Sequence, residues 1–169
     1  RQARLEAINQ ALHLHVPLIK LMNTIRHHIA THYSRDYLVS RGEFLTAHLM
    51  AAYLGYTFVD AADLLFFDQN GAIDEAKTLA AYRRLPRHHG IVVPGFYGQN
   101  AAGHVQLMAR GGSDISGAWL ARLAQADLYE NWTDVSGIKM ADPRIIQDAD
   151  SIDVMSYCLL YTSDAADEL

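Results

Sequence analysis

Apolar residues recur at helical spacing through the first part of the chain, and this periodicity predicts two consecutive helices. The repeat is formed by Leu5, Ile8, Leu12, Val16, Ile19 and Met22. Pro17 falls inside the repeat and marks the break between the helices, because proline lacks the N–H that a helix interior needs. A third helix is predicted from Phe44 to Leu54, and Gly55 is the residue type that commonly follows a helix end.

Further along the chain, short apolar segments alternate with turns and helices. The predicted strands are Tyr56–Val59, Leu64–Phe67, Ile91–Val93 and a half-buried Ala126–Trp132, with His104–Ala109 as the hairpin partner of Ile91–Val93. A turn is predicted at Asp68–Gly71, and a helix is predicted from Asp74 to Leu85, where Pro86 stops it. Another turn, Pro94–Gly98, follows the strand Ile91–Val93. Several polar turns are therefore expected where strands end.

Composition narrows the class of protein. The chain has 169 residues, half of them apolar, which suffices for one domain with a core. Its net charge of −5 disfavours nucleic acid as a partner. No apolar run has the length of a membrane span and no signal peptide opens the chain, so we expect a soluble, cytoplasmic protein. The single cysteine, Cys158, cannot form an internal disulfide.

Histidines are frequent in the first helical region and invite a metal interpretation. They are His13, His15, His27, His28 and His32. Only His28 and His32 have the four-residue spacing that places two ligands on one helix face, and no carboxylate lies beside them. We therefore expect solvated helix faces here and no metal site.

A glycine-rich turn, Arg110 to Asp114, separates the apolar run Val105–Ala109 from a helical pattern that begins near Ile115. Ser113 or Asp114 can cap that helix, while the paired glycines let the backbone approach an anion at the helix N-terminus. A capped strand-to-helix turn with no further role is the alternative. The opposite charges of Arg110 and Asp114 favour a zwitterionic ligand over simple packing.

A second polar turn, Thr133 to Ile138, follows the predicted strand Ala126–Trp132. Ligands of open α/β sheets bind beyond the carboxyl ends of strands, which is where Thr133 and Asp134 are expected. Asp142 stands before Pro143 and suits a turn in its own right, so a structural role is favoured for it.

Four motifs in this order resemble the aspartate kinases of the amino-acid kinase superfamily over about two-thirds of the chain. They are Ser40-Arg41-Gly42-Glu43, Gly95-Phe96-Tyr97-Gly98, the Ala-Arg-Gly-Gly-Ser-Asp turn that ends at Asp114, and Glu130 to Ile138 with the later Met-Ala-Asp-Pro-Arg turn. Sister kinases of acetylglutamate, glutamate and uridylate carry segments similar to the last of these. The Arg-Gly-Gly-Ser-Asp turn, preceded by Gly-Glu, favours aspartate.

The resemblance implies a fold and a reaction. The fold is a three-layer α/β/α sandwich on a mainly parallel sheet. The reaction transfers the γ-phosphoryl group of ATP to the side-chain carboxylate of L-aspartate, giving 4-phospho-L-aspartate in the first step of lysine, threonine and methionine biosynthesis. That carboxylate is already ionised at neutral pH, so the reaction requires positioning and charge cancellation but no general base.

The resemblance also implies roles for residues on the substrate side and the nucleotide side. Arg110 and Asp114 are the expected catalytic residues, with Arg110 pairing with a substrate carboxylate and Asp114 meeting the ammonium group or Mg²⁺ and its waters. The expected substrate-binding residues are Glu43, Phe96, Arg110, Gly111, Gly112, Ser113 and Asp114. The expected nucleotide-binding residues are Thr133, Asp134, Lys139 and Arg144. Lys139 departs from the family pattern, which has an aromatic or aliphatic contact there.

Glu43 also has a purely structural interpretation. Ser40 followed three residues later by Glu43 is a capping box, which would explain both residues by the start of a helix. The residues alone do not separate the two roles. The resemblance favours recognition of the amino acid by Glu43.

We expect residues 1–157 to be a partial kinase catalytic domain. The family's Lys-Phe-Gly-Gly strand would precede Arg1, and its regulatory domains, through which the parent enzyme would form a homo-oligomer, would follow Tyr157. Residues 158–169 look like the translation of a sequencing adapter and should pack poorly. This polypeptide is therefore expected to be inactive alone. The alternatives are a non-catalytic nucleotide- or amino-acid-binding module and a sister kinase for another carboxylate or uridylate.

Overall fold

The computed structural model describes residues 2–86, 90–109 and 111–132. The chain divides into two compact units, Arg1–Tyr129 and Glu130–Leu169. In the second unit the structure describes residues 130–132, which form neither helix nor strand. The arrangement below is that of the first unit.

Three helices open the chain, α1 (Gln2–Ala11), α2 (Leu18–Thr31) and α3 (Arg35–Leu54). The predicted break at Pro17 is confirmed, because Pro17 occupies the N-cap position of α2. These helices share an apolar core in which Leu18, Ile25, Leu45 and Leu49 are buried. Helical periodicity in the sequence thus produces one face of each helix that packs against its neighbour.

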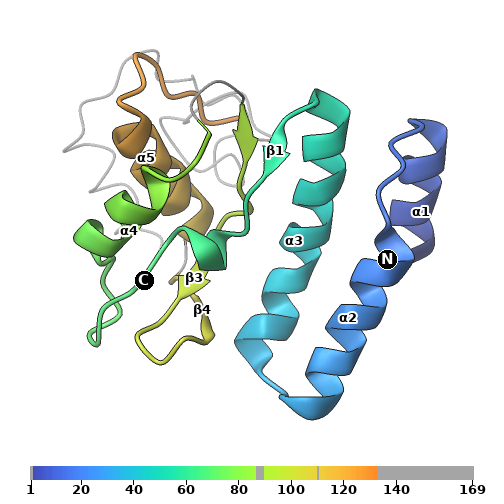
Figure 1. The fold of residues 1–169 in the computed structure, drawn as a ribbon, viewed down its shortest axis with the longest axis horizontal. Coiled ribbons are helices and arrows are strands. Elements are labelled where there is room, and N and C mark those ends of the chain that lie inside the picture. The colour runs from blue at the N-terminus through green and yellow to red at the C-terminus, as the bar shows by residue number, and fades with distance from the viewer. Residues whose placement is uncertain (1, 87–89, 110, 133–169) are drawn as a thin grey trace, which may run out of the picture. The chain divides into compact units, whose positions relative to one another are not determined.

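Short strands follow, interrupted by helices: β1 (Thr57–Phe58), η1 (Ala61–Asp63), α4 (Glu75–Tyr82), β2 (Ile91–Val92), β3 (Tyr97–Gln99), β4 (Val105–Leu107) and α5 (Gly112–Ala124). β1 and β2 are parallel, with Thr57 opposite Ile91. β3 and β4 are antiparallel, with Gly98 opposite Gln106. Figure 1 shows α3 on one side of these strands, with α4 and α5 on the other.

The segment Leu64–Phe67 was predicted as a strand, but it is not a paired strand of either sheet. It forms only an isolated parallel bridge from Phe66 to Gln99 and an antiparallel bridge from Phe67 to Ile73. The buried hydroxyl of Thr78 on α4 accepts a hydrogen bond from the N–H of Phe66, which fastens α4 to this segment.

Two strand predictions were wrong. The hairpin partner of Val105–Leu107 is Tyr97–Gln99, not Ile91–Val93, because β2 pairs in parallel with β1. Residues 126–132, all of which are described, form no strand. After α5 the chain places the hydroxyl of Tyr129 directly over Gly117, where it would meet an added Cβ.

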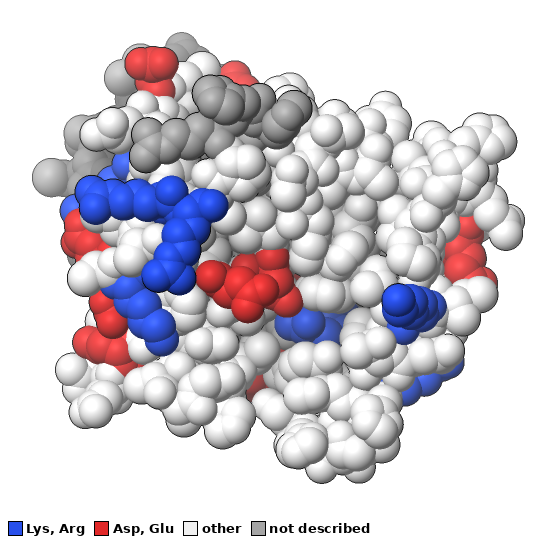
Figure 2. All heavy atoms as spheres, in the orientation of Figure 1, with Lys and Arg blue, Asp and Glu red and all other residues white. Residues whose placement is uncertain are grey.

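Charges are intermixed on the surface. On the face shown in Figure 2, several basic side chains adjoin one another on the side of α4 and α5, with acidic side chains beside them. Arg122 and Glu75 form an ion pair across the two helices at 2.6 Å. No helix within the described ranges combines the length and apolar character of a membrane span.

Candidate functional site at the glycine turns

The glycine turn before α5 begins the helix at an earlier residue than predicted. Gly111 has φ of 77° and occupies the N-cap position, so the helix begins at Gly112. The predicted cap by Ser113 or Asp114 was therefore wrong, and both residues lie in the first helical turn. A glycine has no side chain with which to bind the first backbone N–H groups of the helix. The positive end of the α5 dipole is thus presented at the turn.

The turn that contains Phe96 packs directly against this helix start. A Cβ added to Gly112 would lie 2.7 Å from the Cβ of Met108 and 3.0 Å from the Cβ of Phe96. A Cβ added to Gly95 would lie 3.1 Å from the hydroxyl of Ser113. The Phe96 turn and the start of α5, which are distant in the sequence, therefore lie in contact. This contact leaves no room for a side chain at Gly112.

Ser116 joins the two turns through its buried hydroxyl. The hydroxyl accepts a hydrogen bond from the N–H of Phe96 at 3.0 Å and donates to the carbonyl of Gly112 at 2.7 Å. The carbonyl of Phe96 in turn accepts from the N–H of Met108 at 2.8 Å. Phe96 is held in this way at φ of 60°, a backbone conformation that costs energy for a residue with a side chain.

Glu43 lies on α3, and its capping interpretation was wrong. The helix begins at Arg35, and the side chain of Ser34 caps it by accepting from the N–H of Tyr37. Ser40 lies inside the helix, where its buried hydroxyl donates to the carbonyl of Tyr37. Glu43 is exposed on the same helix. The structure thus removes the structural alternative for Glu43.

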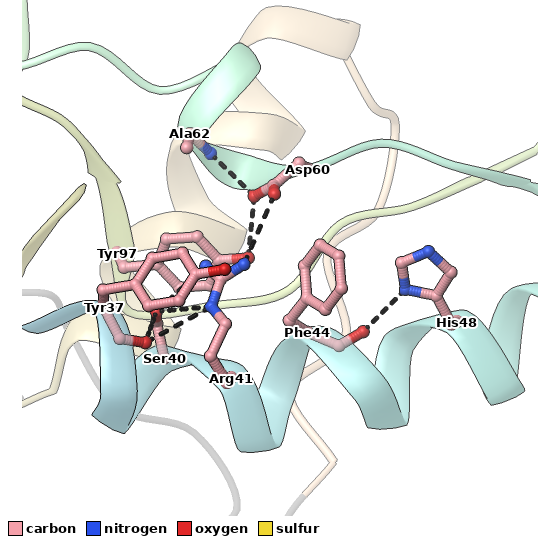
Figure 3. Close-up of polar contacts among 8 residues, drawn as sticks. All are labelled: Tyr37, Ser40, Arg41, Phe44, His48, Asp60, Ala62 and Tyr97. Carbon is pink, nitrogen blue, oxygen red and sulfur yellow. Dashed lines mark hydrogen bonds and ion pairs between the residues drawn. The ribbon is translucent and has the colours of Figure 1, made fainter. Parts of the chain in front are cut away.

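A buried arginine stands between Ser40 and Glu43. Arg41 is 6% exposed, and its guanidinium lies 4.3 Å from the ring centroid of Tyr37 and 4.4 Å from that of Phe44. Its Nη1 is 3.8 Å from Oδ2 of Asp60 (Figure 3). The hydroxyl of Tyr97 donates to Oδ1 of the same carboxylate at 2.8 Å.

Sequence reasoning missed Ser116, Arg41 and Asp60. A serine or arginine among helical residues is usually solvent-facing, so neither was singled out. A possible signal is that Ser116 stands four residues after Gly112, where its hydroxyl can reach back to that carbonyl. Asp60 caps the short helix η1 by accepting from the N–H of Ala62. That local role alone would have explained its position.

Five residues assigned to the site by sequence lie outside the described residues: Arg110, Thr133, Asp134, Lys139 and Arg144. The tail Cys158–Leu169 lies outside them as well. The structure brings together Phe96, Gly111, Gly112 and Ser113. The approach of Glu43 to Asp114 remains a prediction.

Two recesses in the first unit lie away from these turns. One of about 680 Å³ is lined by α1 and α2 residues, including Glu6 and Lys20. The other, of about 600 Å³, includes Leu123 and Gln125 at the opposite end of α5 from Gly112. We place more weight on the polar contacts at the turns than on cavity size, because an anion at a helix N-terminus requires only a shallow site.

The five histidines of the helical region are exposed, which confirms the predicted solvated helix faces. The ring of His28 on α2 lies 4.1 Å from that of Tyr37 on α3 and 5.6 Å from that of His32. Within the described ranges, no group of three or more His, Cys, Asp or Glu side chains is arranged to hold a metal ion.

Comparison with known proteins places these motifs in a family. The model of the amino acid kinase family matches residues 4–166. The chain is 34% identical to aspartokinase 1 of Bacillus subtilis over 132 residues, which is 73% of this chain and 33% of that protein. It is also 34% identical to lysine-sensitive aspartokinase 3 of Escherichia coli over 137 residues, or 72% of this chain and 30% of that protein.

Solved structures give the same result. A crystal structure of Clostridium acetobutylicum aspartate kinase superposes with a TM-score of 0.85 at 38% identity, covering 95% of this chain and 37% of that one. A structure of Escherichia coli aspartokinase III in complex with aspartate and ADP gives a TM-score of 0.69 at 27% identity, covering 89% and 40%.

The chain spans about a third of the length of the curated relatives that it matches. Its α/β architecture, with helices on both sides of the strands and a parallel β1–β2 pair, agrees with the structural likeness and confirms the predicted fold class. The family match covers almost the whole chain, and it includes both glycine turns. This chain therefore belongs to the amino acid kinase family.

Proposed function

We propose that the protein transfers the γ-phosphoryl group of ATP to the side-chain carboxylate of L-aspartate. The observation that carries this proposal is the contact of the Phe96 turn with the start of α5, where Ser116 binds both segments. Both turns are motifs that resemble those of aspartate kinases. A solved relative with the same fold was captured with aspartate and ADP, which supports this choice of substrates.

In the proposed reaction, a carboxylate oxygen of aspartate forms a bond to the γ-phosphorus while the bond from that phosphorus to the β-phosphate oxygen breaks. The products are 4-phospho-L-aspartate and ADP. The carboxylate, with a side-chain pKa of about 3.9, is ionised before it reacts and needs no base. The barrier arises from bringing two anions together, so the protein's contribution is alignment and positive charge.

The substrate side of the proposed site can supply part of that contribution. The first N–H groups of α5, which the glycine at the N-cap position does not bind through a side chain, would bind an anionic oxygen. Arg110 would pair with a carboxylate of aspartate through its planar fork. Glu43 would bind the ammonium group of aspartate from α3. Phe96 would pack against the substrate from the opposing turn.

The nucleotide side is assigned to Thr133, Asp134, Lys139 and Arg144. Mg²⁺ is commonly held by one or two carboxylates together with substrate phosphates and water, and Asp114 in the first turn of α5 fits that mode. The ion would neutralise charge that develops on the phosphoryl group.

The place of this reaction would be the first step of lysine, threonine and methionine biosynthesis, in a cytoplasmic homo-oligomer. The complete translation product of the gene is the form in which to test it, because the relatives are about three times longer than the match. Acyl phosphates react with hydroxylamine to give hydroxamates, so an ATP-dependent hydroxamate assay reports the product directly.

The assay should compare L-aspartate with L-glutamate, N-acetyl-L-glutamate and uridylate, with ADP release followed in parallel. We expect hydroxamate and stoichiometric ADP with L-aspartate. Greater turnover of another acceptor would support a sister kinase. Binding of nucleotide or aspartate without turnover would support a non-catalytic module.

Arg110→Ala removes the side chain that is proposed to pair with a carboxylate of aspartate. We expect kcat/KM for aspartate to fall by roughly 30- to 1000-fold, from loss of a charge-assisted bond of about 2–4 kcal/mol. The KM for ATP should change much less. Arg122→Ala removes an exposed arginine at the far end of the helix and is the control. An ATP-specific defect, or none, would show that Arg110 is misassigned.

A further inference from the structure

Arg41, Asp60 and Tyr97 form a polar cluster that the proposed reaction does not use, in which Arg41 and Tyr97 are buried and Asp60 is half-buried. They come from α3, from the segment before η1 and from β3, so three separate elements meet at one carboxylate (Figure 3). Tyr97 is fully buried and its hydroxyl donates to Asp60 at 2.8 Å. The guanidinium of Arg41 lies 5.3 Å from the centroid of the Tyr97 ring.

Both carboxylate oxygens of Asp60 have polar partners. Oδ1 accepts from the N–H of Ala62 at 3.0 Å as well as from Tyr97, while Oδ2 faces Arg41 at 3.8 Å. Arg41 is itself held by Nε, which donates to the hydroxyl of Ser40 at 3.1 Å. Within the described ranges, every buried side-chain nitrogen or oxygen has at least one hydrogen-bond partner, those of this cluster included.

The cluster connects α3, which carries Glu43, with the turn that carries Phe96. Arg41 precedes Glu43 by two residues on α3. Tyr97 directly follows Phe96, whose backbone is held at φ of 60° by Ser116 and Met108. A shift of Tyr97 relative to α3 would therefore move Phe96 relative to Glu43.

We propose that Arg41, Asp60 and Tyr97 are positioning residues that set the distance between the Phe96 turn and α3, and so the geometry of the aspartate site. This inference rests on the proposed function. The cluster does not touch the substrate, because Tyr97 is fully buried and the charge of Arg41 already faces Asp60.

General energetics favour a positioning role over simple stabilisation. A buried ion pair is seldom more stable than apolar side chains of similar volume, because its desolvation offsets its attraction. Directional hydrogen bonds, by contrast, fix the angle and distance between the elements that they join. Burial, and then the charge of Asp60, raise the pKa of Tyr97 far above its ordinary value, so its hydroxyl remains a donor at neutral pH.

Tyr97→Phe is the sharpest test because it deletes one hydroxyl and keeps the ring under Arg41. In the complete gene product, we expect the KM for aspartate to rise about tenfold, with kcat and the KM for ATP changed less than about twofold. Asp60→Asn keeps an oxygen for Tyr97 and should give a smaller increase. Arg41→Met should give a larger one.

Arg122→Met is the matched control for Arg41→Met. Arg122 also pairs with a carboxylate, Glu75, and its guanidinium lies 4.9 Å from the Trp119 ring, but its side chain is 61% exposed. We expect this variant to keep the aspartate KM of the parent. An equal change in both arginine variants would overturn the proposal.

Hydrogen exchange gives a reading that does not depend on activity. In Tyr97→Phe we expect faster amide exchange at Phe96, Tyr97 and Met108, with unchanged exchange in α2.

Unchanged exchange at Phe96 would overturn the positioning role even if the KM rose. An unaltered aspartate KM, despite faster exchange, would reduce the cluster to a purely structural one. Absence of aspartate phosphorylation in the parent protein would instead refute the proposed function, and exchange alone would then decide whether the cluster positions the turn.

Discussion

The helical core between α2 and α3 and the contact between the two glycine turns are stabilised in different ways. In the core, Leu18, Ile25 and their neighbours interact through aliphatic surface that has no preferred direction. At the turns, Ser116 and Gly112 act through particular atoms, namely one hydroxyl and one missing Cβ. Changes in the core should therefore alter stability in proportion to lost volume, whereas changes at the turns should alter geometry.

The largest expected loss of stability comes from the core. Leu18 is 2% exposed, so Leu18→Ala should lower the free energy of unfolding by about 2–5 kcal/mol through lost burial and a residual cavity. Ile19 on the same helix is 64% exposed, and Ile19→Ala should cost less than about 0.5 kcal/mol. Urea denaturation of both variants measures the difference. Equal losses would mean that α2 does not pack as described.

At the turns, Ser116→Ala should lower the free energy of unfolding by about 1–3 kcal/mol, because the N–H of Phe96 loses its acceptor. The aspartate KM should rise as well, unlike in Leu18→Ala. Ser116→Thr keeps a hydroxyl and should recover part of both losses. A Ser116→Ala protein with parental stability and KM would show that the hydroxyl does not join the turns.

His48 on α3 lies at the edge of the apolar region and allows a pH test. Its ring stacks on Phe58 at 3.5 Å, and Nδ1 donates to the carbonyl of Phe44. Burial lowers its pKa below the ordinary 6.5. The unfolded chain therefore binds the proton more tightly, and stability should decline as the pH falls below about 6.5. We expect His48→Gln to show a weaker decline between pH 7.5 and pH 5 in urea titrations. An identical decline would exclude His48 as its source.

The smallest effect is expected at the surface pair of Arg122 and Glu75. Both side chains are more than half exposed, so solvent screens the pair and Arg122→Met should cost only about 0–1 kcal/mol. Thermal unfolding at low and high salt measures this value. A loss as large as that of Ser116→Ala would mean that the pair contributes more than its exposure allows.

The sequence predicted the periodic elements better than the contacts between them. The helix break at Pro17, the strand near Thr57 and the helix after Asp74 follow from local patterns, which is why they were found. Ser40 was misassigned because the helix that Ser34 caps begins at Arg35 and continues through it. The cap at Ser34 is a local signal that sequence reasoning overlooked.

The contact between the two turns involves residues that sequence motifs mark, whereas the buried polar contacts involve residues that no motif marks. Gly112 and Phe96 belong to glycine motifs and lie against each other, while their roles in binding stay predictions. Arg41 and Ser116 were missed because their roles depend on partners 19 or 20 residues away along the chain, Asp60 and Phe96. The strand predicted after Ala126 fails for a related reason, since Tyr129 instead packs over Gly117.

The central claim is that the contact between the turns determines aspartate binding independently of overall stability. The most direct measurement is calorimetric titration of L-aspartate, with nucleotide present, into Leu18→Ala and Ser116→Ala proteins under conditions where both remain folded. We expect Ser116→Ala to bind aspartate about tenfold more weakly and Leu18→Ala to stay within about twofold of the parent protein. Equal weakening in both variants, or parental affinity in Ser116→Ala, would contradict that claim.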